Sequence, residues 1–202
     1  MVIPIRSFTF GKRRLAEALG TGARLALGAE LAGRVVAAAD PLPVVVVSSA
    51  PEVRAWTAPR DIPVIDDPGS LDVAAEAGAA WHLARGACRV VVVHADLPLA
   101  RGGSLRRFTT DGARPIVTLV PSHRDEGTPV FSVPLPVPAG LRFAYGPGSF
   151  RRHARAARAA GLAVRVVRDP TLAFDLDVAD DLRALTRAEP GRQVYGPTVS
   201  IR

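Results

Sequence analysis

Hydrophobic and polar positions follow two patterns along the chain, one typical of buried strands and one typical of amphipathic helices. Short apolar runs predict strands at residues 2–5, 43–48, 62–65, 88–93, 115–120 and 163–167. Helical spacing and capping residues predict helices at 15–19, 23–39, 51–57, 70–85, 104–109, 147–160 and 178–187. Strands that alternate with helices predict an α/β fold, with one mostly parallel central sheet flanked by helices.

The organisation of the chain is that of one domain. No repeat or linker divides residues 1–189, and we expect the tail at 190–202 to be loose. Proline and polar residues dominate 121–138, which we expect to be a loop with one extended piece at 130–133. No apolar run approaches the roughly 18 residues that span a bilayer, so we expect a cytoplasmic protein without membrane contact.

The most informative stretch is Val90–Val93, four β-branched residues followed closely by Asp96. An apolar run of this kind predicts a strand buried on both faces of a parallel sheet. Asp96 then lies just beyond the carboxyl end of the strand, which is the edge where ligands bind in open α/β sheets. A carboxylate there suits a divalent cation that accompanies phosphates. The alternative is an ordinary aspartate that caps a turn.

Two further motifs carry candidate chemistry. Asp175 and Asp177 alternate along an extended segment, so both carboxylates face one side and could complete a metal site with Asp96. The turn Tyr145–Phe150 is bracketed by glycines and feeds a helix whose N-terminus favours an anion, and Ser149 adds a hydroxyl there. A solvated strand edge and a plain helix cap are the alternatives.

Charge and composition narrow the ligand class. The net charge is +7, but the arginines are spread along the chain without interleaved aromatic residues. This pattern favours a small polyanionic substrate over nucleic acid. Lys12 is the one lysine among 26 basic residues, which indicates a compact ammonium for phosphate. The single cysteine, Cys88, is expected to be a buried thiol without a role.

Several motifs in the same order resemble one enzyme family. The N-terminal Ile3-Pro4-Ile5-Arg6 with Lys12-Arg13-Arg14-Leu15, then Ala95-Asp96-Leu97-Pro98-Leu99, Gly127-Thr128, Tyr145-Gly146-Pro147-Gly148-Ser149-Phe150 and Asp175-Leu176-Asp177, resemble the 2-phospholactate or phosphoenolpyruvate guanylyltransferases of coenzyme F-420 biosynthesis. The family shares the nucleotide-diphospho-sugar transferase fold, which is GT-A-like and Rossmann-type, with the molybdenum-cofactor guanylyltransferases.

The resemblance implies a Mg²⁺-dependent transfer of GMP from GTP to the phosphate of a three-carbon acid, with release of pyrophosphate. It implies catalytic roles for Lys12, Arg14 and Asp96. The same resemblance implies nucleotide binding by Arg6, Lys12, Arg14, Gly69 and Asp72, acceptor binding by Thr128, Gly146 and Ser149, and metal binding by Asp96, Asp175 and Asp177. The acceptor would be phosphoenolpyruvate, 2-phospho-L-lactate or 3-phosphoglycerate, and a downstream transferase is a possible partner.

Three positions depart from the family pattern. Asp72 and Pro129 stand where the family usually has asparagine, and Ala95 stands where it has glycine. These departures leave two alternatives open. One is a nucleotidyltransferase of other specificity, of the sugar-phosphate or molybdopterin type, and the other is a nucleotide-binding homologue without catalysis.

Overall fold

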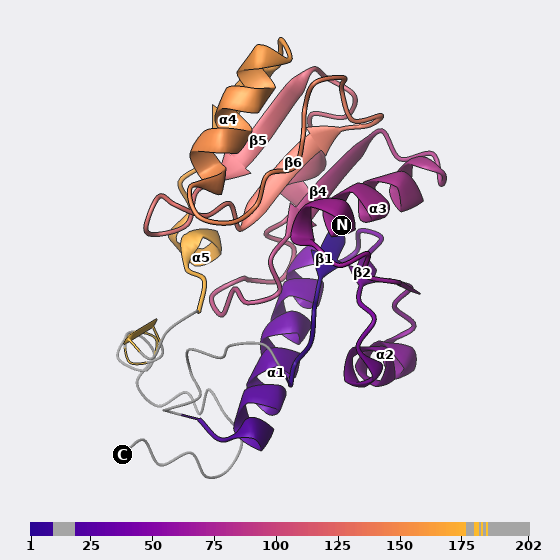
Figure 1. Ribbon diagram of the computed structural model, residues 1–202, viewed down its shortest axis with the longest axis vertical. Helices are drawn as coiled ribbons and strands as arrows, with labels where there is room; N and C mark the ends of the chain where they lie inside the picture. The colour runs from indigo at the N-terminus through magenta and orange to yellow at the C-terminus, as the bar shows by residue number, and fades with distance from the viewer. Residues whose placement is uncertain (10–18, 177–179, 182, 184, 186–202) are drawn as a thin grey trace.

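The computed structural model describes residues 1–9, 19–176, 180, 181, 183 and 185. A seven-stranded sheet with the order β3-β2-β1-β4-β6-β5-β7 runs through this part of the chain (Figure 1). The strands are β1 Val2–Pro4, β2 Val45–Val47, β3 Val64–Ile65, β4 Arg89–Val93, β5 Ile116–Val120, β6 Val130–Pro134 and β7 Ala163–Val166. The helices are α1 Thr21–Ala39, α2 Pro51–Thr57, α3 Leu71–Leu83, α4 Ser149–Ala159 and α5 Pro170–Ala173, with 3₁₀ turns η2 Ala58–Arg60 and η3 Arg106–Thr109.

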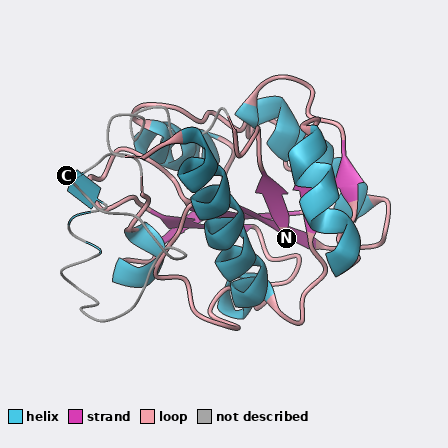
Figure 2. Ribbon diagram, turned by 90° about the horizontal axis from the view of Figure 1, so that it is seen from below, coloured by secondary structure: helices cyan, strands magenta, loops and turns pink. Residues whose placement is uncertain are grey.

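The sheet separates two hydrophobic layers, as the alternation of side chains along a strand requires. Val90 and Val92 of β4 pack with α3 and α4, whereas Val91 and Val93 pack with α1, α2 and α5. The sheet therefore lies between helices that cover both of its faces (Figure 2). This arrangement confirms the predicted α/β fold with a buried central strand.

Two helices show how the sequence fixes this packing. Leu27, Leu31 and Val35 repeat along one face of α1 and are each at most 1% exposed. Ser70 caps α3 by accepting a hydrogen bond from the Val73 amide at 3.3 Å, as its position before the helix predicts. Gly78 in α3 lies directly over β1, because a Cβ there would meet the side chain of Val2 at 2.3 Å.

The extended piece predicted at 130–133 is confirmed, but its place in the sheet was not predicted. It forms β6, a fully buried strand between β4 and β5. It is antiparallel to both neighbours, while the other strand pairs are parallel. The flanking prolines suggested a loop around this segment, because proline normally marks a break or an edge of a sheet.

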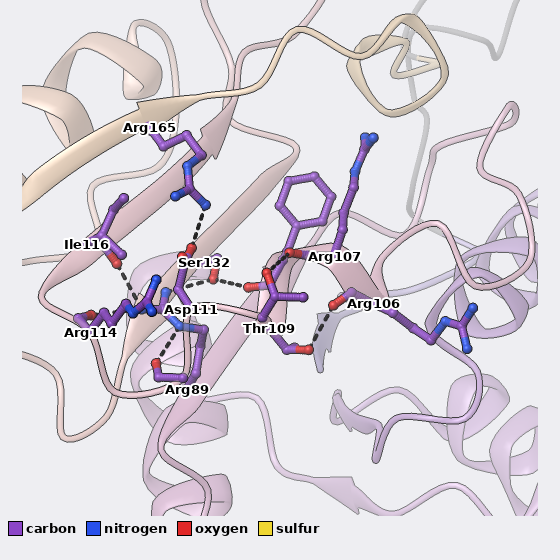
Figure 3. A network of polar contacts seen from close by, with 12 residues as sticks. Arg89, Arg106, Arg107, Thr109, Asp111, Arg114, Ile116, Ser132 and Arg165 are labelled. Atoms are coloured by element: carbon purple, nitrogen blue, oxygen red, sulfur yellow. Dashed lines mark hydrogen bonds and ion pairs between the residues drawn. The ribbon is translucent and has the colours of Figure 1, made fainter.

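A buried arginine holds this antiparallel strand at the end of the sheet away from Asp96. The guanidinium of Arg89 donates to Ser132 Oγ at 3.0 Å and to three backbone carbonyls between residues 112 and 116 (Figure 3). Ser132 in turn donates to the Phe108 carbonyl at 2.6 Å. Asp111 pairs with Arg165 of β7 at 2.7 Å. The network joins β4, β5, β6 and β7 at the end of β4 opposite to Asp96.

The other predicted strands and helices are mostly confirmed, with ends that differ from the predicted ones. Residues 104–109 form the shorter 3₁₀ turn η3, and the sequence did not reveal α5. Cys88 is exposed and not buried, because it precedes the first residue of β4. The predicted helix at 15–19, most of that at 178–187 and the tail at 190–202 lie outside the described residues. No described helix is long and apolar enough to cross a membrane.

Candidate active site

A cavity of about 450 Å³ opens at the sheet edge where the parallel strands β1, β3 and β4 end. This is the edge at which ligands bind in open α/β sheets. The lining residues are Pro4, Ile5, Arg6, Ser7, Phe8, Arg24, Gly28, Asp67, Gly69, Ser70, Leu71, Ala74, His94, Ala95, Asp96 and Asp175. Four of the predicted site residues, Arg6, Gly69, Asp96 and Asp175, therefore share one cavity.

Two carboxylates that line this cavity come from segments joined by a backbone hydrogen bond. Asp96 follows β4, and its carbonyl accepts a hydrogen bond from the Leu176 amide at 3.1 Å. This bond brings the segment after α5 beside the end of β4, although about eighty residues separate the two in sequence. Asp175 directly precedes Leu176 and lines the same cavity as Asp96, and their shared metal site stays a prediction. Asp177 lies outside the described residues.

Asp175 has a partner that the sequence did not reveal. His123 Nδ1 lies 3.1 Å from Asp175 Oδ1, and the imidazole packs against the Phe174 ring with 5.1 Å between centroids. His123 Nε2 is also 3.7 Å from the buried Asp181, which pairs with Arg124 at 2.6 Å. These contacts fix the acidic segment to the loop between β5 and β6.

Two arginines bring positive charge to the cavity. Arg6 comes from the loop after β1, and Arg24 comes from the first turns of α1. Arg24 lies one turn before Leu27, which packs in the same cluster as Leu176. Arg24 was not predicted as a site residue, because its spacing is that of any helical arginine. Lys12 and Arg14 lie outside the described residues.

The loop that carries Arg6 is held by its own hydrogen bonds. Ser7 Oγ donates to the Glu52 carboxylate at 2.5 Å and accepts from the Thr9 amide at 3.0 Å. The bond from Ser7, more than any other contact, lowers the pKa of Glu52. Phe8 packs closely on α1 beside Gly28, where a Cβ would meet its ring at 2.9 Å. These contacts hold the backbone that carries the Arg6 guanidinium.

Asp72, one of the departures from the family pattern, has a partner within the protein. Its Oδ1 accepts a hydrogen bond from the Tyr145 amide at 2.6 Å, which ties the start of α3 to the turn before α4. Asp72 is not among the residues that line the cavity. Its carboxylate serves the turn in this conformation, and its predicted contact with nucleotide stays a prediction.

Two of the predicted acceptor residues, Thr128 and Ser149, form a buried network with His153. Thr128 Oγ1 and Ser149 Oγ are 3.1 Å apart, and His153 Nδ1 is 3.1 Å from Thr128 Oγ1. His153 Nε2 accepts from the Ala144 amide at 2.8 Å, so that ring nitrogen is unprotonated. Burial lowers the pKa of His153 to about 3. Thr128, Gly146 and Ser149 do not line the described cavity, and their contact with an acceptor stays a prediction.

The donor set fits a hard cation bound together with phosphates. Asp96 and Asp175 supply carboxylate oxygens to one cavity, and Mg²⁺ usually takes one or two protein carboxylates with substrate phosphates and waters. Among the described residues no group of three histidine, cysteine, aspartate or glutamate side chains has metal-binding geometry.

The fold is that of the nucleotidyltransferases and nucleotide-diphospho-sugar transferases. A nucleotidyl transferase from Methanothermobacter thermautotroptrophicus superposes with a TM-score of 0.63 at 15% identity, over 93% of this chain and 95% of the other. A Desulfovibrio desulfuricans G20 protein assigned to the nucleotide-diphospho-sugar transferases gives 0.73 at 15% identity, over 95% and 88% of the two chains.

The chain belongs to the family described as guanylyl transferase CofC like, whose model matches residues 1–194. A phosphoenolpyruvate guanylyltransferase from Sphaerobacter thermophilus is 32% identical over 194 residues, 94% of this chain and 93% of the relative. A 2-phospho-L-lactate guanylyltransferase from Halobacterium salinarum is 38% identical over 178 residues, 85% and 77% of the two chains. The resemblance seen in the sequence motifs is confirmed.

Proposed function

We propose that the protein transfers GMP from GTP to the phosphate of a three-carbon acid, with release of pyrophosphate, in coenzyme F-420 biosynthesis. One observation carries this proposal: Asp96, Asp175, Arg6 and Arg24 converge on a single cavity at the carboxyl edge of the sheet. Family membership supports the guanylyl donor, because the relatives are guanylyltransferases for phosphoenolpyruvate or 2-phospho-L-lactate.

In this proposal the protein acts by positioning and by charge. Asp96 and Asp175 would hold Mg²⁺, which when bound supplies charge stabilisation for the reacting phosphates. Arg6 and Arg24, with Lys12 and Arg14, would neutralise the pyrophosphate that leaves. The acceptor phosphate attacks the α-phosphorus of GTP in line, so the bond to the leaving pyrophosphate breaks as the new diphosphate bond forms.

The acceptor pocket in this proposal lies at the turn before α4. Thr128, Gly146 and Ser149 would hold the phosphate and the carboxylate of the acid. The bond between Asp72 and the Tyr145 amide supports this arrangement, because it attaches the turn to α3, whose first residues line the nucleotide cavity. The names of the relatives leave phosphoenolpyruvate and 2-phospho-L-lactate as the leading acceptors.

Pyrophosphate release tests the reaction directly. We expect a signal with Mg²⁺, GTP and one acid among phosphoenolpyruvate, 2-phospho-L-lactate and 3-phosphoglycerate, and little signal with ATP or CTP. If folded protein releases no pyrophosphate in any combination, the proposed reaction is wrong.

Substitution of Asp96 tests the assignment of the site. We expect Asp96→Asn to lower turnover by at least 10²-fold, since it removes a metal-binding charge while leaving the size of the side chain unchanged. Asp66→Asn, at an exposed aspartate outside the cavity, is the matched control and should keep full activity. Unchanged turnover in a folded Asp96→Asn protein would move the metal site elsewhere.

A further inference from the structure

A third carboxylate lines the cavity at the end that the proposed chemistry does not use. Asp67 follows β3, whereas Asp96 follows β4. In the order β3-β2-β1-β4, three strand spacings separate these two strands, about 14 Å at the usual distance between neighbours. A nucleotide whose phosphates lie at Asp96 and Asp175 would therefore extend toward Asp67.

The cavity that Asp67 lines also has an apolar part that suits a flat base. Pro4, Ile5, Leu71 and Ala74 line the cavity with apolar surface from the end of β1 and the start of α3. Arg6 and Arg24, by contrast, line the same cavity with guanidinium groups from the loop after β1 and from α1. The cavity thus combines an apolar part, which suits a nucleobase, with a cationic part, which suits phosphates.

Local hydrogen bonds hold Asp67 in place. Its Oδ1 accepts from the Gly69 amide at 2.9 Å, and its own amide donates to Ser49 Oγ at 3.0 Å. Gly69 has φ +110°, which a side chain would oppose, so this turn depends on glycine. A carboxylate oxygen can accept more than one hydrogen bond, so Asp67 keeps acceptor capacity for a ligand in the cavity that it lines.

The adjacent aspartate provides a contrast. Asp66 pairs with Arg54 at 2.5 Å on the exposed side of the loop and does not line the cavity. Asp66 and Asp67 carry the same charge and lie in the same loop, but of the two only Asp67 lines the cavity. We therefore expect Asp67, and not Asp66, to contact a ligand in the cavity.

We propose that Asp67 selects guanine by accepting hydrogen bonds from its N1–H and its exocyclic 2-amino group. Guanine presents these two donors side by side, and a carboxylate is an acceptor-only group that matches them. Adenine presents an acceptor at N1 and no 2-amino group, so it would leave the carboxylate unpaired. This inference rests on the proposed use of GTP and adds the residue that distinguishes GTP from other nucleotides.

The test exchanges the pattern of donors and acceptors on both partners. Asp67→Asn keeps an oxygen for the Gly69 amide but replaces the other oxygen with an N–H donor, which suits the 2-oxo group of xanthine. We expect kcat/KM for GTP to fall roughly 10- to 100-fold and kcat/KM for XTP to rise by a similar factor. Asp66→Asn is the matched control and should leave both values unchanged.

Equilibrium binding of GTP and XTP to the same three proteins separates this inference from the proposed reaction. If the wild type prefers GTP in binding but releases no pyrophosphate with any acceptor, the reaction is wrong and the role of Asp67 is still measured. The role of Asp67 is refuted if Asp67→Asn keeps the wild-type preference, if it weakens both nucleotides equally, or if Asp66→Asn behaves alike. A wild type that binds neither nucleotide overturns both proposals.

Discussion

At the scale of single residues, His153 is the buried polar group with the clearest energetic consequence. It is fully buried, its ring stacks on Phe131 with 4.4 Å between centroids, and both ring nitrogens have partners. Burial is the main reason that its pKa falls from 6.5 to about 3, and the nearby Arg152 adds to the effect. The folded protein therefore keeps this imidazole neutral where an unfolded chain would protonate it.

The pKa of His153 predicts a loss of stability in mild acid. Between pH 6.5 and 3 the unfolded chain binds a proton that the folded protein excludes, so the free energy of unfolding falls as the pH falls. We expect His153 alone to cost about 1–2 kcal/mol between pH 6.5 and 5, measured by urea unfolding. His153→Gln retains an acceptor for the Ala144 amide and should show a shallower pH dependence, although it is less stable at pH 7. Equal slopes for the two proteins would contradict this account.

At the scale of elements, close packing of α3 on β1 shows why helix propensity alone misjudges a position. Gly78 is a poor helix former by intrinsic preference, but a Cβ would meet Val2 side-chain atoms at 2.3 Å. Gly33 of α1 has the same intrinsic disadvantage, and there a Cβ would meet only Trp56 Cζ2, at 3.9 Å. The two positions share the low helix propensity of glycine and differ in the space available for a Cβ atom.

Alanine at these two positions separates propensity from packing. We expect Gly78→Ala to destabilise the protein by about 1–3 kcal/mol, because crowding against β1 exceeds the gain in propensity. Gly33→Ala should stabilise it by up to about 1 kcal/mol. Thermal and urea unfolding of both variants measure the difference. Stabilisation by Gly78→Ala would show that α3 moves away from β1 without cost.

At the scale of the whole molecule, the cavity depends on segments that are distant in the chain. Its lining includes Arg6 after β1, Arg24 of α1, Asp67 after β3, Asp96 after β4 and Asp175 after α5. A ligand that contacts all of them binds the folded state alone, because an unfolded chain does not bring them together. Ligand binding is therefore linked to the global stability of the domain.

This linkage predicts thermal stabilisation by nucleotide. GTP with Mg²⁺ at one hundred times its dissociation constant should add about 2.7 kcal/mol, which raises the Tm of a domain this size by roughly 5–10 °C. GTP with EDTA should give a smaller shift, and Asp96→Asn should lose the dependence on Mg²⁺. No shift with GTP and Mg²⁺ would show that nucleotide does not bind this cavity.

The sequence by itself determined the elements that depend on local periodicity and the residues that stand at strand ends. The run Val90–Val93 and the repeat of Leu27, Leu31 and Val35 specified a buried strand and an amphipathic helix, because these patterns report which faces are buried. The position of Asp96 beyond its strand was readable for the same reason. The family motifs then indicated guanylyl transfer, which family membership supports.

Only the tertiary structure decided which distant residues meet. The pairing of β6 between β4 and β5, the contact of His123 with Asp175 and the opposite surroundings of Asp66 and Asp67 depend on contacts between segments far apart in sequence. The hydrogen bond from the Tyr145 amide to Asp72 also joins segments that are far apart in the sequence. Local patterns carry no record of such partners, since a carboxylate has the same side chain whether it faces solvent, a cation or a ligand.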